Sequence, residues 1–475
     1  MNKHTSYYAV MLRRFFDIYR DLTYLKVPIC KHIYFQFLGF INHRWGLKWS
    51  EENLDYVRNE IDLIQESEVF DWADEPYPCK ANPDGTFLMR GGFGDLAAAH
   101  LPIERCFLLS PNQAELDVIK MNRPDLHSHN IEEFYRPNSN SDALRKLTAK
   151  CTKLVQESSG DPVFGSPDFL KWLSDKLPDI VIRFEAVQRL IDDLNVAAVL
   201  TVSSIHWFCS ALNLLARANY IPSITLQHGI ITDSQLFCHT PILATKKAIW
   251  GESTRQWYQK YGTPSSRLTV TGSPRFDIIF SREWGGRERL LQLTEIDPKY
   301  RIAVYTTQPL GGAKIRTVAP IVINGLKTIE NLFLLIMLHP NEKPELYQQL
   351  AADFPNCRVL RFGTISLYHA LSGADLFITC FSTAALEAMH FQLPVVTVEP
   401  FEPNFSFGDW GASQVVRTEK ELHQVTEQLL TDDEFRKKSI ARYQQFHRDF
   451  CIPDDSAAKR LINELVKIST EGGIY

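Results

Sequence analysis

The sequence lacks several features that would fix its class at once. Among its 475 residues, no apolar run reaches the roughly 18 residues of a membrane-spanning helix. The N-terminus has no uninterrupted apolar core followed by small residues, so no signal peptide is visible. No unit of roughly 20–50 residues repeats along the chain. These absences favour an ordinary globular protein.

Cysteine pairs and an excess of positive charge are also missing. The nine cysteines are scattered and form no C-x-x-C pair, which favours reduced thiols in a cytosolic protein. The formal net charge of −5 argues against general binding to nucleic acid. We therefore expect a cytoplasmic protein without a nucleic-acid partner.

The first 50 residues differ from this ordinary composition. They carry eight Lys or Arg against two Asp, interleaved with many aromatic residues. One interpretation is a patch that rests on anionic lipid, which would make the protein peripheral on the inner face of the membrane. The interpretation that we favour is a helical layer packed on the next domain.

Length and patterning predict two domains. A chain of 475 residues exceeds what one hydrophobic core usually supports. After the first 80 residues, apolar runs alternate with longer helical patterns, which favours βαβ units and parallel sheets. The expected fold class is α/β, with two Rossmann-like doubly wound domains facing a cleft and helical extensions at both termini. The predicted boundaries are 1–80 (basic-aromatic helical extension), 81–285 (first Rossmann-like domain), 286–445 (second Rossmann-like domain) and 446–475 (C-terminal helix).

The apolar runs also place the individual elements. Residues 86–101 predict a strand, a glycine turn and a helix, and the polar stretch 281–300 looks like the interdomain connection. The chain is expected to be helical and charged from Glu419 onward. Further strands are predicted within 197–204, 221–229, 246–251, 267–277, 301–309, 332–340 and 357–363.

Polar residues at the ends of these strands define the candidate site. In doubly wound sheets, ligands bind beyond the carboxyl ends of the strands, so only polar residues at those ends are candidates. They are the GGFGD loop (91–95), Ser203–Ser204, Gln227–His228–Gly229, Gly272–Ser273–Pro274–Arg275, Thr306–Thr307–Gln308, His339–Pro340 and Ser382–Thr383.

The stretch FSTAALEAMH (381–390) predicts a nucleotide site. Ser382 and Thr383 stand where a helix begins, and the N–H groups of a helix N-terminus attract phosphate oxygens. Glu387 lies one helical turn past Thr383 on the same face, where its carboxylate could accept hydrogen bonds from the two hydroxyls of a ribose. An N-capped helix with a surface Glu is the alternative.

His339 strengthens the prediction of a nucleotide site. It follows the apolar run 332–338 and precedes Pro340, so the strand ends there and the imidazole is expected to face the cleft. Beside a phosphate, it would stabilise charge on a departing nucleotide, although a lone histidine at a strand end is often structural. We place Pro340, Thr307, Gly272 and Ser273 in the same nucleotide site.

The first half of the chain offers two candidates for a general base. His228 stands beside Gly229 in QHG, and glycine lets a backbone approach a ligand closely. Asp95 ends the GGFGD loop, which lacks the G-x-G-x-x-G spacing. Either group could take a proton from an acceptor hydroxyl. The alternatives are a helix N-cap for Asp95 and a hydrogen-bonded loop support for His228.

The order of these motifs resembles the two-domain GT-B glycosyltransferases. It runs over roughly residues 195–400, from QHG through IWGESTRQWYQKYG, VTGSPRFD and HP to STAALEAMHFQLPVV. It is most similar to the bacterial group that assembles capsule, lipopolysaccharide and teichoic polymers. HP and the Ser–Thr pair resemble motifs of bacterial sialyltransferases, which resemble Kdo transferases in using CMP-sugars.

This resemblance implies roles for particular residues. His339, Ser382 and Thr383 would contact the donor phosphate, Glu387 would hold the ribose, and the N-terminal domain would supply the catalytic base. Neither an obligatory metal nor another cofactor is implied, and no D-x-D motif stands at a strand end. The acidic motif of the sialyltransferases is absent in recognisable form, and QHG stands in roughly the corresponding region.

The expected function is a glycosyltransferase of bacterial surface polysaccharide synthesis. It would transfer a sugar from a CMP- or UDP-linked donor to a glycan or lipid-linked acceptor, with inversion. The CDP-glycerol glycerophosphotransferases are similar in the same places, so transfer of a polyol phosphate is an alternative. A sugar-nucleotide epimerase of the same fold and a non-catalytic assembly partner are two others, because one fold hosts many reactions.

Overall fold

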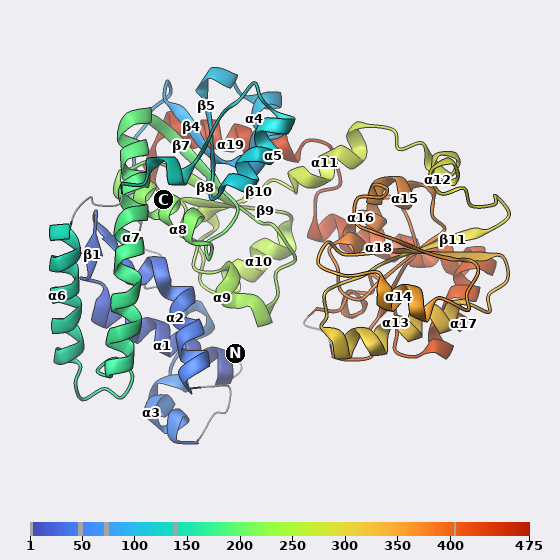
Figure 1. Ribbon diagram of the computed structural model, residues 1–475, viewed down its shortest axis with the longest axis horizontal. Coiled ribbons are helices and arrows are strands. Elements are labelled where there is room, and N and C mark those ends of the chain that lie inside the picture. Colours follow the sequence, from blue (N-terminus) through green and yellow to red (C-terminus); the bar gives the residue numbers. More distant parts are fainter. Residues whose placement is uncertain (1–2, 46–50, 71–75, 137–140, 403–404) are drawn as a thin grey trace. The chain divides into compact units, whose positions relative to one another are not determined.

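The computed structural model describes residues 3–45, 51–70, 76–136, 141–402 and 405–475. The chain forms two compact units (Figure 1). The first unit comprises Met1–Thr271 together with Ala458–Tyr475, and the second comprises Gly272–Ala457. Across the described ranges, every helix is too short or too polar to cross a lipid bilayer.

The first unit is built on a seven-stranded parallel sheet in the order β10-β9-β8-β7-β4-β5-β6. The order reverses between β4 and β7, which is the switch point where ligands bind in doubly wound sheets. Its central strands are nearly continuous apolar runs because helices cover both faces. The strands are β4 (Thr86–Arg90), β5 (Cys106–Ser110), β6 (His127–Asn130), β7 (Val196–Thr201), β8 (Ser223–Leu226), β9 (Lys246–Ile249) and β10 (Leu268–Val270).

Helices pack on both faces of this sheet. On one face, α7 and α8 share a core with Leu88 and Val199, and α6 lies beside α7 in Figure 1. On the other face, α4 and α19 share a core with Phe87 and Met89. The helices are α4 (Gly94–His100), α5 (Gln113–Asn122), α6 (Ser141–Glu157), α7 (Pro167–Leu194), α8 (Trp207–Ala218), α9 (Leu236–His239), α10 (Glu252–Lys260) and α19 (Ala457–Glu471).

The N-terminal segment is a helical layer of the first unit. It contains α1 (Lys3–Tyr19), the hairpin of β1 (Thr23–Tyr24) and β2 (Val27–Pro28), α2 (Ile29–Trp45) and α3 (Glu51–Ile61). The ring of Phe37 lies 4.3 Å from Phe15 and 5.6 Å from Phe164 of the domain. These aromatic side chains are therefore part of the core, as the favoured interpretation expected. Contact with a membrane stays a prediction.

The second unit is built on a six-stranded parallel sheet in the order β13-β12-β11-β14-β15-β16. Its switch point lies between β11 and β14. The strands are β11 (Arg301–Thr306), β12 (Leu332–Met337), β13 (Cys357–Leu360), β14 (Leu376–Thr379), β15 (Val395–Val398) and β16 (Gln414–Val416).

The helices of the second unit also form two layers. One layer shares a core with Ala303 and Tyr305 of β11 and consists of α13, α14 and α17, which lie along the lower side of this sheet in Figure 1. In the other layer, α12 packs on α15, and α16 packs on α18. The helices are α11 (Pro274–Ser281), α12 (Gly286–Thr294), α13 (Gly312–Leu326), α14 (Glu345–Leu350), α15 (Leu367–Gly373), α16 (Ala384–His390), α17 (Glu419–Thr431) and α18 (Asp433–Phe450).

Some elements differ from the sequence expectation. The strand predicted within 267–277 ends at Val270, because Pro274 occupies the first turn of α11, where its fixed φ favours a helix. The predicted interdomain connection 281–300 contains α12, which packs on the second unit, so the units divide after Thr271 instead of after residue 285. In the C-terminal region, α18 belongs to the second unit and α19 to the first.

The aromatic core of the N-terminal layer gives the first prediction. Phe37 is fully buried, so Phe37→Ala leaves a cavity and should lower the free energy of unfolding by about 3–5 kcal/mol. Met121→Ala is the matched control, because Met121 is 82% exposed and should change that free energy by less than about 0.5 kcal/mol. Urea unfolding measures both. Equal, small effects of the two variants would contradict the burial of this layer.

Candidate functional site

Three strand ends of the second sheet carry the predicted nucleotide-binding residues. Thr307 follows β11, His339 follows β12, and Ser382 and Thr383 follow β14. Because the order is β12-β11-β14 and neighbouring strands are about 4.8 Å apart, the ends that carry His339 and Ser382 are about 10 Å apart with Thr307 between them. The parallel sheet thus brings these residues to one edge, as predicted.

Thr307 holds the loop that carries His339. Its hydroxyl donates a hydrogen bond to Glu342, and its oxygen accepts one from the backbone N–H of His339 at 2.9 Å. The Tyr347 hydroxyl donates to the other Glu342 oxygen at 2.9 Å. The Thr307 side chain is therefore engaged in positioning His339, and its contact with a nucleotide stays a prediction.

The His339 ring is oriented by its own loop. The backbone N–H of Asn341 donates to Nδ1 of His339 at 3.2 Å. In the neutral imidazole, the proton therefore resides on Nε2, which becomes a donor. The side chain is half-buried and the adjacent Pro340 is exposed. A half-buried Nε2–H at the end of a parallel strand suits an oxyanion ligand.

Hydrogen bonds of backbone and side chains hold the loops at the switch point of the second sheet. Gln308 accepts a hydrogen bond from the backbone N–H of Phe381 at 2.9 Å, which ties the loop after β11 to the loop after β14. The Ser382 hydroxyl accepts from the Ala384 N–H at 3.2 Å. Thr383 has helical backbone angles and makes no side-chain cap. Of the Ser–Thr pair, Ser382 thus supports the start of α16.

Glu387 lies inside this site and is only 2% exposed. Its Oε1 accepts hydrogen bonds from Arg275 Nε at 2.9 Å and from the Tyr368 hydroxyl at 3.0 Å. Burial and then the Glu387 charge raise the pKa of Tyr368, so this hydroxyl stays protonated as a donor. Within the described part of the chain, Oε2 of Glu387 is buried and has no hydrogen-bond partner. The carboxylate is therefore paired with Arg275 through one oxygen, while its other oxygen is left unsatisfied.

Two predicted nucleotide contacts stand at the start of the second unit. Gly272 follows β10 with φ +77°, a left-handed conformation that glycine adopts without strain. Ser273 is 4% exposed and immediately precedes α11, the helix that supplies Arg275. They belong to a different strand end from Thr307 and His339, and their role in a nucleotide site stays a prediction.

Both candidates for the general base lie at the carboxyl edge of the first sheet. Asp95 is in the first turn of α4, its side chain is 92% exposed, and one oxygen lies 3.5 Å from Arg123. His228 follows β8, and its ring centroid lies 5.8 Å from that of His239 in α9. The order β8-β7-β4 separates their strands by two intervals. The pKa of His228 is lowered, first because the surrounding protein desolvates the ring and second because of the charge of Lys247. The lowered pKa favours the neutral ring that a base requires.

The turn at His228 is fixed by its neighbour Gln227. The Gln227 carboxamide oxygen accepts from the Trp250 backbone N–H at 2.9 Å, and its nitrogen donates to the Gly229 carbonyl at 3.0 Å. The Trp250 indole returns a hydrogen bond to the Gln227 carbonyl at 3.0 Å. Gln227 therefore joins the ends of β8 and β9 and leaves the His228 ring at the surface of the edge.

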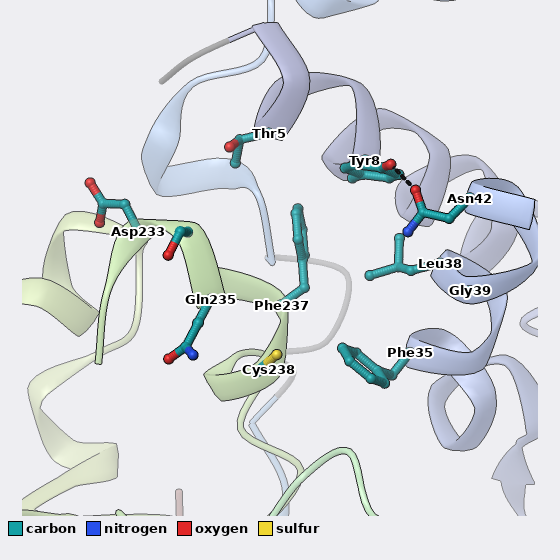
Figure 2. Close-up of a pocket in the computed structure, with 11 residues that line it drawn as sticks. Thr5, Tyr8, Phe35, Leu38, Gly39, Asn42, Asp233, Gln235, Phe237 and Cys238 are labelled. Carbon is teal, nitrogen blue, oxygen red and sulfur yellow. Dashed lines mark hydrogen bonds between the residues drawn. The ribbon is translucent and has the colours of Figure 1, made fainter. Parts of the chain in front are cut away.

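A cavity of about 440 Å³ opens between the N-terminal layer and the segment after β8. Figure 2 shows Phe35 and Leu38 of α2 facing Phe237 and Cys238 of α9 across it, while Asp233 points away. The Tyr8 hydroxyl bonds to Asn42 on its rim. This cavity is mainly apolar, and the sequence did not indicate it, because its walls come from segments about 200 residues apart.

The described residues contain no group of three or more His, Cys, Asp or Glu side chains that could hold a metal ion. The independence from metals stays a prediction. Sequence reasoning missed Tyr368, which orients Glu387, and Lys247, which lies near His228. Tyr368 comes from a helix before β14, and Lys247 lies within a strand, so neither stands at a strand end.

The comparisons with known proteins identify the fold. No protein-family model and no curated protein matches the chain. A solved UDP-GlcNAc 2-epimerase from Neisseria meningitidis bound to UDP-GlcNAc has a TM-score of 0.53 at 12% identity, over 80% of this chain and 99% of that one. A putative UDP-N-acetylglucosamine 2-epimerase from Listeria monocytogenes gives 0.51 at 14% identity, over 80% and 95%. The S. aureus MnaA–UDP structure gives 0.50 at 14% identity, over 81% and 96%.

These similarities, together with the two doubly wound parallel sheets, confirm the predicted GT-B fold class. At 12–14% identity, they concern the fold and not the activity.

A histidine pair, with His447 buried and His390 half-buried, anchors the helix that carries Glu387. His390 ends α16 and His447 lies in α18, with their Nε2 atoms 3.1 Å apart. Phe276 and Phe280 pack on His390 at 5.1 and 4.9 Å. Burial lowers the pKa of His390 to about 2 and that of His447 to about 4. Both rings are therefore neutral at neutral pH.

This pair predicts an acid-sensitive second unit. The folded-state pKa values lie below the unfolded value of about 6.5, so the unfolded state binds more protons as the pH falls below 6.5. Stability should fall by up to about 2 kcal/mol per ring near pH 5. Between about pH 7.5 and pH 5, the melting temperature of the double variant His390→Leu/His447→Leu should fall less than that of the wild type. An unchanged pH dependence would contradict the assignment.

Proposed function

We propose that the chain is a nucleotide-sugar-dependent glycosyltransferase of bacterial surface polysaccharide synthesis. The second unit would bind a UDP- or CMP-linked sugar, and the first would bind a glycan or lipid-linked acceptor. The observation that carries this proposal is the buried Glu387 with one orphaned oxygen, on the helix that follows Ser382 and Thr383 at the switch-point edge. A ribose hydroxyl is a donor that fits a carboxylate oxygen without a partner.

The similar structures support a nucleotide ligand. The Neisseria meningitidis enzyme is bound to UDP-GlcNAc, and the S. aureus structure contains UDP. By analogy of fold, we extend the UDP ligand to this chain. The transferred sugar and the polysaccharide remain part of the proposal.

The proposed chemistry assigns one task to each group. The acceptor hydroxyl attacks the anomeric carbon, the bond from that carbon to the phosphate oxygen breaks, and the nucleotide leaves with the bonding electrons. His228 or Asp95 takes the proton of the hydroxyl. The Nε2–H of His339 stabilises the negative charge that develops on the leaving phosphate. Direct displacement inverts the anomeric centre and needs no covalent intermediate.

The role of His339 gives a prediction for turnover. His339→Ala removes the donor to the leaving phosphate and should lower kcat by about 10²–10³-fold. The melting temperature should change little, because the half-buried ring makes only one hydrogen bond within its own loop. His127→Ala is the control, since His127 is exposed at the start of edge strand β6. Wild-type turnover in His339→Ala would refute the site.

A panel of donors tests the reaction class. We expect nucleotide release from a UDP- or CMP-sugar only when an acceptor glycan or lipid-linked glycan is present. Release of CMP from CDP-glycerol would instead establish a polyol-phosphate transferase. The panel uses full-length protein with each donor and chromatographic detection of the free nucleotide.

The second candidate is a sugar-nucleotide epimerase, which is favoured by the two 2-epimerases among the structures compared above, those of Neisseria meningitidis and Listeria monocytogenes. An epimerase changes the sugar without any acceptor. Incubation with UDP-GlcNAc alone, followed by separation of epimeric UDP-sugars, therefore distinguishes the two. Conversion without acceptor would replace the glycosyltransferase proposal.

A further inference from the structure

Two adjacent lysines of β9 have opposite environments. Successive side chains of a strand point to opposite faces of the sheet. Lys246 points to the face covered by α19, where its ammonium lies 2.5 Å from the Glu464 carboxylate. Lys247 points to the face of α8 and is 1% exposed. Among the described residues, Lys247 has no hydrogen bond or ion pair.

A buried ammonium without an anion is strongly unfavourable. Lysine is almost never fully buried unless it is paired, because water solvates its charge much better than a protein interior does. Burial lowers the pKa of Lys247 to about 8, so most molecules still carry the charge at neutral pH. An anion bound beside Lys247 would pair with this charge and remove the cost of its burial.

The groups around Lys247 are also without partners. Thr225 is its register partner on β8, so both side chains lie on the same face. Oγ1 of Thr225, Oγ of Ser204 and Nδ1 of His239 are buried and lack hydrogen-bond partners within the described ranges. The rings of His239 and His228 lie close together, with centroids 5.8 Å apart, and the charge of Lys247 lowers the pKa of both after burial does.

The clustering of these atoms is specific to one edge. Eight buried side-chain atoms of the described residues lack a partner, and five of them belong to the first unit, four in or just after β5, β7 and β8 and one at the end of α9. Ligands bind at this carboxyl edge in doubly wound sheets. The five residues are Ser110, Ser204, His206, Thr225 and His239.

The donor set suits a phosphoryl group better than a carboxylate. A lysine acts as a compact point charge, and hydroxyl and imidazole groups add single donors from different directions, which matches a tetrahedral anion. A flat carboxylate favours the paired donors of an arginine. The nearby Arg90 fork is already occupied by Glu115, at 3.3 and 3.1 Å.

We infer that Lys247, Thr225, His239 and His228 form a phosphoryl-binding subsite of the first unit, which holds a phosphate carried by the acceptor. The assignment of this phosphate to the acceptor rests on the proposed function, whereas the anion site itself is inferred from the structure alone. The acceptor would then be a phosphorylated or phosphate-linked glycan, and the subsite would place its hydroxyl near His228.

Two matched variants test the subsite in the full-length protein. Lys247→Met removes the unpaired charge, so its melting temperature without ligand should equal or exceed that of the wild type. Lys246→Met breaks the pair with Glu464 and should lower the melting temperature. A large loss of stability in Lys247→Met would assign this lysine a structural role and overturn the inference.

The ligand arm uses inorganic phosphate, UDP and CMP as separate probes in thermal-shift titrations. A ligand that binds only the native state raises its melting temperature. Phosphate should raise it in the wild type and in Lys246→Met, and Lys247→Met should bind phosphate at least about tenfold more weakly. UDP or CMP should raise it equally in all three proteins.

The outcomes separate the two proposals. Equal phosphate binding by Lys247→Met and the wild type, or no phosphate effect in any protein, would overturn the subsite. Loss of UDP binding in Lys247→Met alone would assign the subsite to the donor phosphates and overturn its acceptor role. Failure of both UDP and CMP to bind any of the proteins, with phosphate behaving as expected, would overturn the proposed function but leave the anion site standing.

Discussion

The parallel register of the two sheets is the constraint on which the rest of the structure depends. Parallel strands need crossover helices, and these helices force both faces of each sheet to be apolar. Polar side chains are then tolerated where the strands end, and the carboxyl ends of all strands in a sheet share one edge. His339 and Ser382 lie at this edge in the second unit, and His228 and Asp95 lie at the corresponding edge in the first.

Unsatisfied buried groups separate the residues that we propose as ligand contacts from polar residues that hold loops. Gln227 and Thr307 are polar residues at strand ends whose side-chain groups have protein partners, so they hold loops. Within the described residues, Glu387 keeps one orphaned oxygen, and Lys247, which is 1% exposed, has no hydrogen bond or ion pair. Buried polar groups are normally satisfied, and these two exceptions lie in elements next to the candidate strand ends, Glu387 in α16 after β14 and Lys247 in β9 beside β8.

The sequence predicted the fold class because long apolar runs alternating with helical patterns have few other solutions. It could not predict the division after Thr271, which depends on the packing of α12 and α15. Strand ends located His339, Ser382 and Arg275, but the sequence could not show that Arg275 and Tyr368, from distant segments, would both bond to Glu387. Lys247 was missed because a lysine within a strand gives no sign of which face it occupies.

The central claim is that the second unit binds the nucleotide. Hydrogen exchange of the full-length chain, measured by mass spectrometry with and without UDP, tests it most directly, because bound ligand slows the local opening of the backbone that it contacts. The account predicts slower exchange in the loop after β12 and from the end of β14 through α16, with no change at the strand ends of the first unit. Protection confined to the first unit would contradict it.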